Sequence, residues 1–199
     1  MHGYDASTAL VVVDVQNDFA DPGGSLAVAG GADVVPVLNA ESAAVREAGG
    51  LVVYTADWHP ARTPHFVTDG GIWPVHCVAG TPGAAFHPDL LVDGPVVLKG
   101  ANGEDGYSGF TMRDPTTGET IPTELETLLR DADVQRVVIG GLATDYCVKA
   151  TALDARSLGF ETAILRDAVR AVNLAPGDGE RALTDLWAAG VDLVTGSVA

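Results

Sequence analysis

Short apolar, β-branched runs alternate along the chain with amphipathic segments. The runs are almost continuous, as in strands that a parallel sheet buries on both faces, and the segments have the character of helices that cover such a sheet. Six runs are predicted as strands: 9–15, 51–56, 96–98, 135–139, 161–165 and 191–194. Four segments are predicted as helices: 33–48, about 122–131, 145–158 and 179–189.

This alternation predicts an α/β fold: a single-domain, three-layer, doubly wound structure over residues 1–199, with a mostly parallel six-stranded sheet and helices on both faces. A hydrophobic content of 47% in 199 residues is enough for a core of that size. Two stretches, 58–95 and 100–121, are rich in Pro and Gly and have no clear period. Loops of this length tend to be functional, so we expect substrate contacts there.

The charge balance excludes one class of partner. Eleven Lys and Arg stand against 27 Asp and Glu, a formal charge of -16 that repels phosphate backbones and anionic membranes. The start of the chain lacks a basic region followed by an apolar stretch, and the run at 9–13 is too short to cross a membrane. We therefore expect a cytoplasmic protein with no nucleic-acid or membrane partner.

The chain has only two cysteines, Cys77 and Cys147. A secreted disulfide framework would need more of them, and although one disulfide remains possible, two reduced thiols fit the composition better. Cys147 follows a glycine-bearing turn and opens a helix, with Thr144 or Asp145 available as the cap. There the helix dipole and free N–H groups would favour a thiolate and could hold an oxyanion. A buried apolar role remains the common alternative, and for Cys77, which has no such setting, it is preferred.

Reactive side chains fall at the ends of the predicted strands. Asp14 ends the first strand, Asp57 the second and Lys99 the third, and Cys147 follows the fourth. In open α/β sheets the binding crevice lies outside the carboxyl ends of the strands. An Asp after a strand is usually a turn residue, but four such groups from four strands predict one common site.

Potential metal ligands are concentrated between positions 57 and 76. Asp57 and His59 are two apart, so both point the same way in an extended segment, and His65 and His76 could reach back from the following loop. A carboxylate and three imidazoles suit Zn, Fe, Mn, Co or Ni. Any one of these histidines alone would be interpreted as a surface residue. His2 and His87 lie outside the pattern and remain unassigned.

Six motifs, in order along nearly the whole chain, resemble those of the nicotinamidases, also called pyrazinamidases, of the isochorismatase-like cysteine hydrolase superfamily. Each is weak alone, and together they are specific. They are 14–19, 57–60 with His65, 73–83, Lys99-Gly100, Tyr107-Ser108-Gly109-Phe110 and 141–148.

The resemblance implies a catalytic triad of Asp14, Lys99 and Cys147. It implies an oxyanion hole from the N–H groups of Ala143 and Cys147, with a cis peptide between Leu142 and Ala143. The resemblance also implies that four ligands bind one divalent ion, with zinc favoured and iron or manganese as alternatives. It further implies that three aromatic side chains form the walls of a pocket for a flat ring. The ligands are Asp57, His59, His65 and His76, and the walls are Phe19, Trp73 and Tyr107.

The implied reaction is hydrolysis of nicotinamide to nicotinate and ammonia through a cysteine thioester, in NAD salvage, with pyrazinamide as a further substrate. Another cysteine amidohydrolase of the superfamily, acting on a ureido or carbamoyl group, is the alternative, but such enzymes generally lack this metal set. A vinyl-ether hydrolase would not use Cys147, and a metal-binding or redox-sensing protein would not need both of its triad partners. Metal identity, ring preference and the choice between monomer and homo-oligomer stay open.

Overall fold

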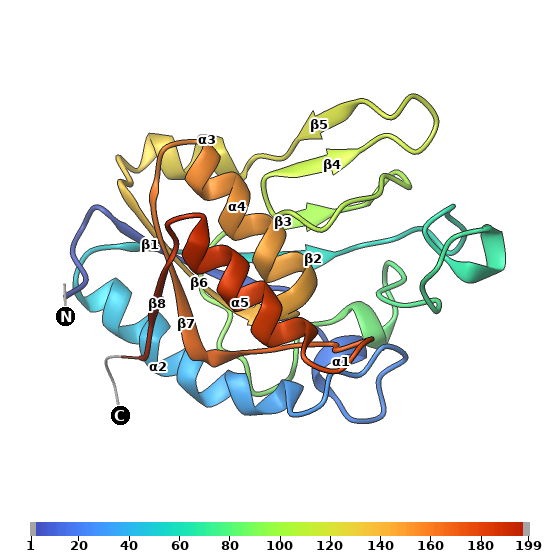
Figure 1. The fold of residues 1–199 in the computed structure, drawn as a ribbon, viewed down its shortest axis with the longest axis horizontal. Helices are drawn as coiled ribbons and strands as arrows, with labels where there is room; N and C mark the ends of the chain where they lie inside the picture. The colour runs from blue at the N-terminus through green and yellow to red at the C-terminus, as the bar shows by residue number, and fades with distance from the viewer. Residues whose placement is uncertain (1–2, 197–199) are drawn as a thin grey trace.

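The computed structural model describes residues 3–196, so both ends of the predicted domain and His2 lie outside the described residues. Its centre is a six-stranded sheet in the order β3-β2-β1-β6-β7-β8 (Figure 1). Every pairing in this sheet is parallel, which confirms the predicted fold class. Its strands are β1 (Thr8–Val13), β2 (Leu51–Asp57), β3 (Val96–Lys99), β6 (Arg136–Leu142), β7 (Glu161–Arg170) and β8 (Asp192–Val194).

Helices cover both faces of the sheet because its central strands are apolar on both sides. Leu10 and Val12 of β1 face a cluster that includes Leu38 of α2 (Val34–Glu47). Val11 and Val13 face the opposite cluster, which α3 (Leu125–Asp131), α4 (Lys149–Ser157) and α5 (Asp178–Ala188) build. The chain also has a short helix α1 (Asn17–Ala20) and 3-10 turns at Gly31–Asp33, Val67–Asp69 and Pro82–Ala84.

Some predicted boundaries were wrong. The stretch 100–121 is not a plain loop, because β4 (Thr111–Arg113) and β5 (Thr120–Pro122) form an antiparallel hairpin apart from the main sheet (Figure 1). Three residues are too few to display a strand period. β6 continues through the glycines to Leu142 because β1 passes very close: a Cβ on Gly141 would lie 2.1 Å from the Val13 carbonyl oxygen.

The predicted helix 145–158 divides in two. Residues Thr144–Val148 form a π-helical turn, and the regular helix α4 begins only at Lys149. Asp145 does not cap this helix; its carboxylate accepts hydrogen bonds from the N–H groups of Val172 and Asn173 after β7. Across residues 3–196, none of the helices combines the length and apolarity that crossing a membrane requires.

Candidate active site

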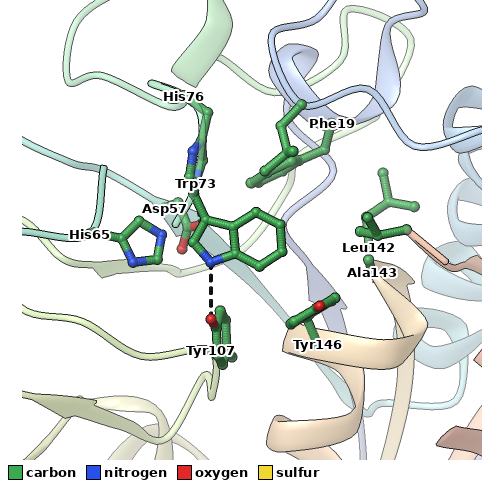
Figure 2. A pocket seen from close by; sticks show the side chains of 11 residues that line it. Phe19, Asp57, His65, Trp73, His76, Tyr107, Leu142, Ala143 and Tyr146 are labelled. Atoms are coloured by element: carbon green, nitrogen blue, oxygen red, sulfur yellow. Dashed lines mark hydrogen bonds and ion pairs between the residues drawn. The ribbon is translucent and has the colours of Figure 1, made fainter. Parts of the chain in front are cut away.

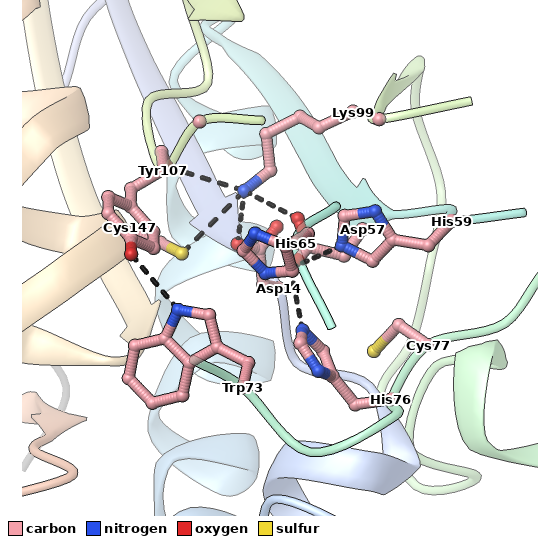
Figure 3. Close-up of polar contacts among 12 residues, drawn as sticks. Asp14, Asp57, His59, His65, Trp73, His76, Cys77, Lys99, Tyr107 and Cys147 are labelled. Atoms are coloured by element: carbon pink, nitrogen blue, oxygen red, sulfur yellow. Dashed lines mark hydrogen bonds and ion pairs between the residues drawn. The ribbon is translucent and has the colours of Figure 1, made fainter. Parts of the chain in front are cut away.

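The site lies where the strand order reverses. β1 separates β2 and β3 on one side from β6 to β8 on the other, and crevices form at such a switch point. The structure brings together there the side chains of Asp14, Asp57, Lys99 and Cys147, and each of these residues is at most 7% exposed (Figure 3). Because this site lies at the carboxyl ends of parallel strands, neighbours in space come from positions far apart in the chain.

Lys99 is the centre of the polar contacts. Its ammonium Nζ lies 2.7 Å from Asp14 Oδ2, 2.9 Å from Asp57 Oδ1 and 3.7 Å from Cys147 Sγ, and it donates to the Tyr107 carbonyl at 3.3 Å (Figure 3). Asp14 adopts a left-handed backbone conformation, φ 49°, and its Oδ1 accepts from the Thr55 hydroxyl at 2.6 Å. A carboxylate oxygen of Asp14 lies within 4.8 Å of Cys147 Sγ. A base and a cation therefore flank the thiol.

Burial decides the protonation state of the thiol. It raises the pKa of Cys147 well above its usual value, and the nearby Lys99 charge only partly opposes this. The resting thiol is therefore protonated at neutral pH, contrary to the thiolate expected from a helix N-terminus. Burial also raises the pKa of Asp14 against the opposing Lys99 charge, which makes this carboxylate a better proton acceptor. Although burial lowers the pKa of Lys99, the two carboxylates raise it well above normal, so the ammonium stays charged.

Beside this group, three histidine rings converge. His59, His65 and His76 each offer a ring nitrogen within 4.8 Å of the others, and all three are buried. Asp57 Oδ2 lies 3.7 Å from His59 Nε2 and 3.8 Å from His76 Nε2. Burial alone would raise the pKa of Asp57, but the Lys99 charge and the neighbouring histidines hold this pKa well below its usual value. The structure thus brings together all four predicted ligands.

The chemistry of this donor set fits a divalent cation. Both ring nitrogens of His59 are buried without a hydrogen-bond partner among residues 3–196, a costly state for groups with nothing to bind. Burial lowers the pKa of His76, which keeps its imidazole neutral, as a metal ligand must be. Asp14, Asp57 and Lys99 together leave one net negative charge in a buried site, which a cation would balance.

The outer nitrogens of two rings are already engaged. His76 Nδ1 lies 2.7 Å from the Pro74 carbonyl oxygen, and His65 Nδ1 lies 2.6 Å from Asp105 Oδ1. Both of these oxygens can only accept, so in a neutral ring Nδ1 carries the hydrogen and Nε2 keeps its lone pair. Each of these two rings is therefore held in the form in which Nε2 can bind a metal.

A pocket opens beside these groups, and Asp57, His65 and His76 are part of its lining (Figure 2). All three predicted aromatic walls line it, and Trp73 Nε1 donates to the Tyr107 hydroxyl at 3.0 Å. Tyr146 adds a fourth ring, edge-on to Trp73 with centroids 4.9 Å apart. The Leu142–Ala143 peptide bond is cis, as the resemblance implied. The full lining is Phe19, Leu26, Asp57, His65, Trp73, His76, Tyr107, Leu142, Ala143, Tyr146 and Val172.

Comparison with known proteins agrees with this geometry. The isochorismatase domain family matches residues 8–196 of the chain. The chain belongs to the isochorismatase family. An Escherichia coli nicotinamidase is 37% identical in an alignment that covers 94% of this chain and 94% of that one. The pyrazinamidase of Pyrococcus horikoshii in complex with zinc is 44% identical, with a TM-score of 0.84, over 95% of this chain and 99% of that one. PnC1 from L. infantum in complex with nicotinate is 37% identical, with a TM-score of 0.87, over 97% of this chain and 95% of that one.

Sequence reasoning missed several residues that this isochorismatase-family site uses. Asp105 and Pro74 bind outer imidazole nitrogens, and Leu26 and Val172 line the pocket. Tyr146 is different, because its place directly before Cys147 already indicates from the sequence that it can affect ring selectivity. Asp105 gave no signal, because its partner His65 stands 40 positions earlier in the chain. Both cysteines are free, and Cys77 is fully buried with its pKa raised mainly by burial, as its structural interpretation requires.

Proposed function

We propose that this protein hydrolyses nicotinamide to nicotinate and ammonia, and pyrazinamide by the same route. One observation carries the proposal: an aromatic-walled pocket has Asp57, His65 and His76 of the metal group on one side and, on the other, Ala143 and Tyr146, which come shortly before Cys147 in the chain. A carboxamide can therefore face the thiol while the ring nitrogen of the same flat molecule faces the metal ligands. The nicotinamidase relative and the nicotinate-bound neighbour support this substrate.

The first half of the reaction forms a thioester. Asp14 accepts the thiol proton as Cys147 Sγ attacks the carboxamide carbon, and the Lys99 ammonium stabilises the charge that moves onto the sulfur. The N–H groups of Ala143 and Cys147 are assigned to the oxyanion, a role in which one donor typically contributes about 3 kcal/mol. The protonated Asp14 then gives its proton to the departing amino group, so that ammonia leaves and the thioester remains.

The second half returns the enzyme to its starting state. Asp14 accepts a proton from a water molecule while the water oxygen adds to the thioester carbon. The C–S bond then breaks. The thiolate of Cys147 takes this proton back from Asp14, the product leaves as nicotinic acid and releases its carboxyl proton to solvent to become nicotinate, and the enzyme gains no net proton or electron. Throughout, Phe19, Trp73 and Tyr107 hold the ring by offset or edge contacts, which contribute about 0.5–1.5 kcal/mol each beyond area burial.

Asp57, His59, His65 and His76 are the residues we assign to one divalent ion, with zinc first and iron or manganese as alternatives. When bound, such an ion supplies a Lewis acid for the ring nitrogen and lowers the pKa of coordinated water. We further place the protein in the cytoplasm, as a single domain over residues 1–199, in a salvage step that recovers nicotinamide for NAD.

Ammonia release from nicotinamide by the zinc-loaded protein tests the function. We expect turnover by the wild type, loss of at least 1,000-fold in Cys147→Ala, and a lesser loss with weaker zinc binding in His59→Ala. Cys77→Ala is the matched control, because it removes the other thiol and leaves the site intact. Release of ammonia from a carbamoyl amino acid but not from nicotinamide would refute the substrate, and full activity in Cys147→Ala would refute the thioester.

A further inference from the structure

The three histidines of the metal group differ in what holds their outer nitrogens. His76 Nδ1 donates to a neutral carbonyl oxygen of its own loop, and His59 Nδ1 has no hydrogen-bond partner among the described residues. Among residues 3–196, only His65 has a charged group at its outer nitrogen: Nδ1 lies 2.6 Å from Oδ1 of the Asp105 carboxylate. The His65 side chain is 6% exposed and that of Asp105 48%, so the carboxylate reaches the ring from the rim of the site.

Asp105 is itself held in place by backbone contacts. Its N–H donates to the Arg113 carbonyl at 2.8 Å, in an antiparallel bridge that joins it to strand β4 of the hairpin. Its Oδ1 also accepts from the Gly106 N–H at 2.9 Å, which orients the carboxylate toward His65. The hairpin therefore gives the carboxylate a fixed position beside a metal-site histidine.

The same short segment contacts every part of the site. Two residues after Asp105, the Tyr107 carbonyl accepts from Lys99, the Tyr107 ring lines the pocket, and its hydroxyl accepts from Trp73. A charged partner on the outer nitrogen of a histidine ligand fixes the tautomer and raises the basicity of the ligating nitrogen. Within residues 3–196 the outer nitrogens of His59 and His76 have no charged partner, so any such effect in this part of the structure depends on Asp105.

We propose that Asp105 is a positioning residue for the metal site: its carboxylate holds His65 in the orientation and tautomer that present Nε2 to the ion. This inference rests on the proposed metal site and deepens it. It assigns the β4–β5 hairpin a function, since the hairpin carries the backbone bridge that places Asp105.

Zinc affinity, measured by chelator competition without substrate, tests the proposal. Loss of such a partner typically costs 10–100-fold in metal affinity. We expect about a 10-fold weaker zinc affinity in Asp105→Asn, which keeps an acceptor but loses the charge, and up to about 100-fold in Asp105→Ala. Glu119→Gln is the matched control: it removes one negative charge from the same hairpin, at an exposed side chain without a hydrogen bond or ion pair within residues 3–196. It should stay within twofold of the wild type.

Two further measurements separate positioning from a general loss of structure. The urea midpoint of the zinc-free Asp105→Asn protein should match that of the wild type, because its side-chain oxygen can still accept from His65 and Gly106 and the backbone bridge to Arg113 persists. In nitrogen-15 spectra of the histidine rings, His65 should be protonated at Nδ1 in the zinc-free wild type and should lose this preference in Asp105→Ala.

Equal zinc affinity in wild type, Asp105→Asn and Asp105→Ala would overturn the proposal, as would an unchanged His65 tautomer. A zinc affinity that falls only in proportion to a lower urea midpoint would also overturn it. A wild type that binds none of zinc, iron and manganese would refute the metal site and this inference together. A wild type that binds zinc but releases no ammonia from nicotinamide would refute the substrate alone, and the affinity comparison would still decide the role of Asp105.

Discussion

A single methyl group added at Gly100 would press directly on the metal site. Gly100 follows Lys99 at the end of β3 with φ +76°, and a Cβ built there lies 2.6 Å from His59 Nδ1 and 2.7 Å from His59 Cε1. Ordinary van der Waals contact begins at 3.4 Å, so in Gly100→Ala the imidazole has to move by about 0.8 Å. His59 is fully enclosed, so this movement also disturbs its neighbours.

Gly80 provides the control for this change. Its φ of +75° is almost the same, but a Cβ there meets nothing within 4 Å. Both alanine variants therefore bear the same left-handed backbone cost, about 1–2 kcal/mol. Overpacking adds roughly 1–3 kcal/mol in Gly100→Ala alone. A shift of this size also exceeds the tolerance of about 0.5 Å within which binding groups must be held, so zinc affinity should fall at least about tenfold in this variant only.

Urea unfolding of the zinc-free proteins and chelator competition for zinc measure the two effects. The expected result is that Gly100→Ala is about 1–3 kcal/mol less stable than Gly80→Ala and binds zinc at least about tenfold more weakly. Equal unfolding free energies and equal zinc affinities in the two variants would refute the argument, because the backbone term is common to both. Crystals of Gly100→Ala with His59 unmoved would refute it as well.

Two further predictions concern the buried base and the surface charge. Thr55→Val removes the hydroxyl that donates to Asp14 at 2.6 Å; it should destabilise the fold by about 1.5–3 kcal/mol and raise the pKa of Asp14. Because the carboxylate is the active form, the acid limb of kcat/KM should then move to higher pH, and an unchanged pH profile would count against Asp14 as the base. The net charge of -16 should make stability depend on salt, because the Debye length falls from about 30 Å at 0.01 M to about 3 Å at 1 M. Calorimetry should show a Tm at least about 4 °C higher in 1 M NaCl, roughly 1–2 kcal/mol for a chain of this size, and an equal or lower Tm would contradict the prediction.

The main sheet could be predicted closely from the chain because its strands depend on local pattern. An unbroken apolar run such as Thr8–Val13 has few alternatives to a strand buried on both faces, and its carboxyl end marks the side where ligands bind. The errors arose where local pattern and tertiary contact disagree. Gly140 and Gly141 indicate a turn locally, yet they continue strand β6, where Gly141 lets β1 pass too close for a side chain.

The long stretch from 100 to 121 shows a different limit. Each strand of its hairpin has three residues, so its sequence has no measurable period. What stabilises the hairpin is the pairing of Met112 with Ile121 and the bridge from Arg113 to Asp105, and these contacts exist only after the chain has folded back. The role of Asp105, which lies in this stretch, could therefore not be predicted from the sequence.

The order of residue types along the chain determined the layers of the fold and which side chains come to one edge of the sheet. Tertiary structure alone decided their chemical state. Burial keeps the Cys147 thiol protonated where a helix N-terminus would have favoured a thiolate, and Asp105 sets which nitrogen of His65 can bind a metal. The physical reason is that protonation and tautomer depend on desolvation and on distances of a few ångströms between groups far apart in the chain.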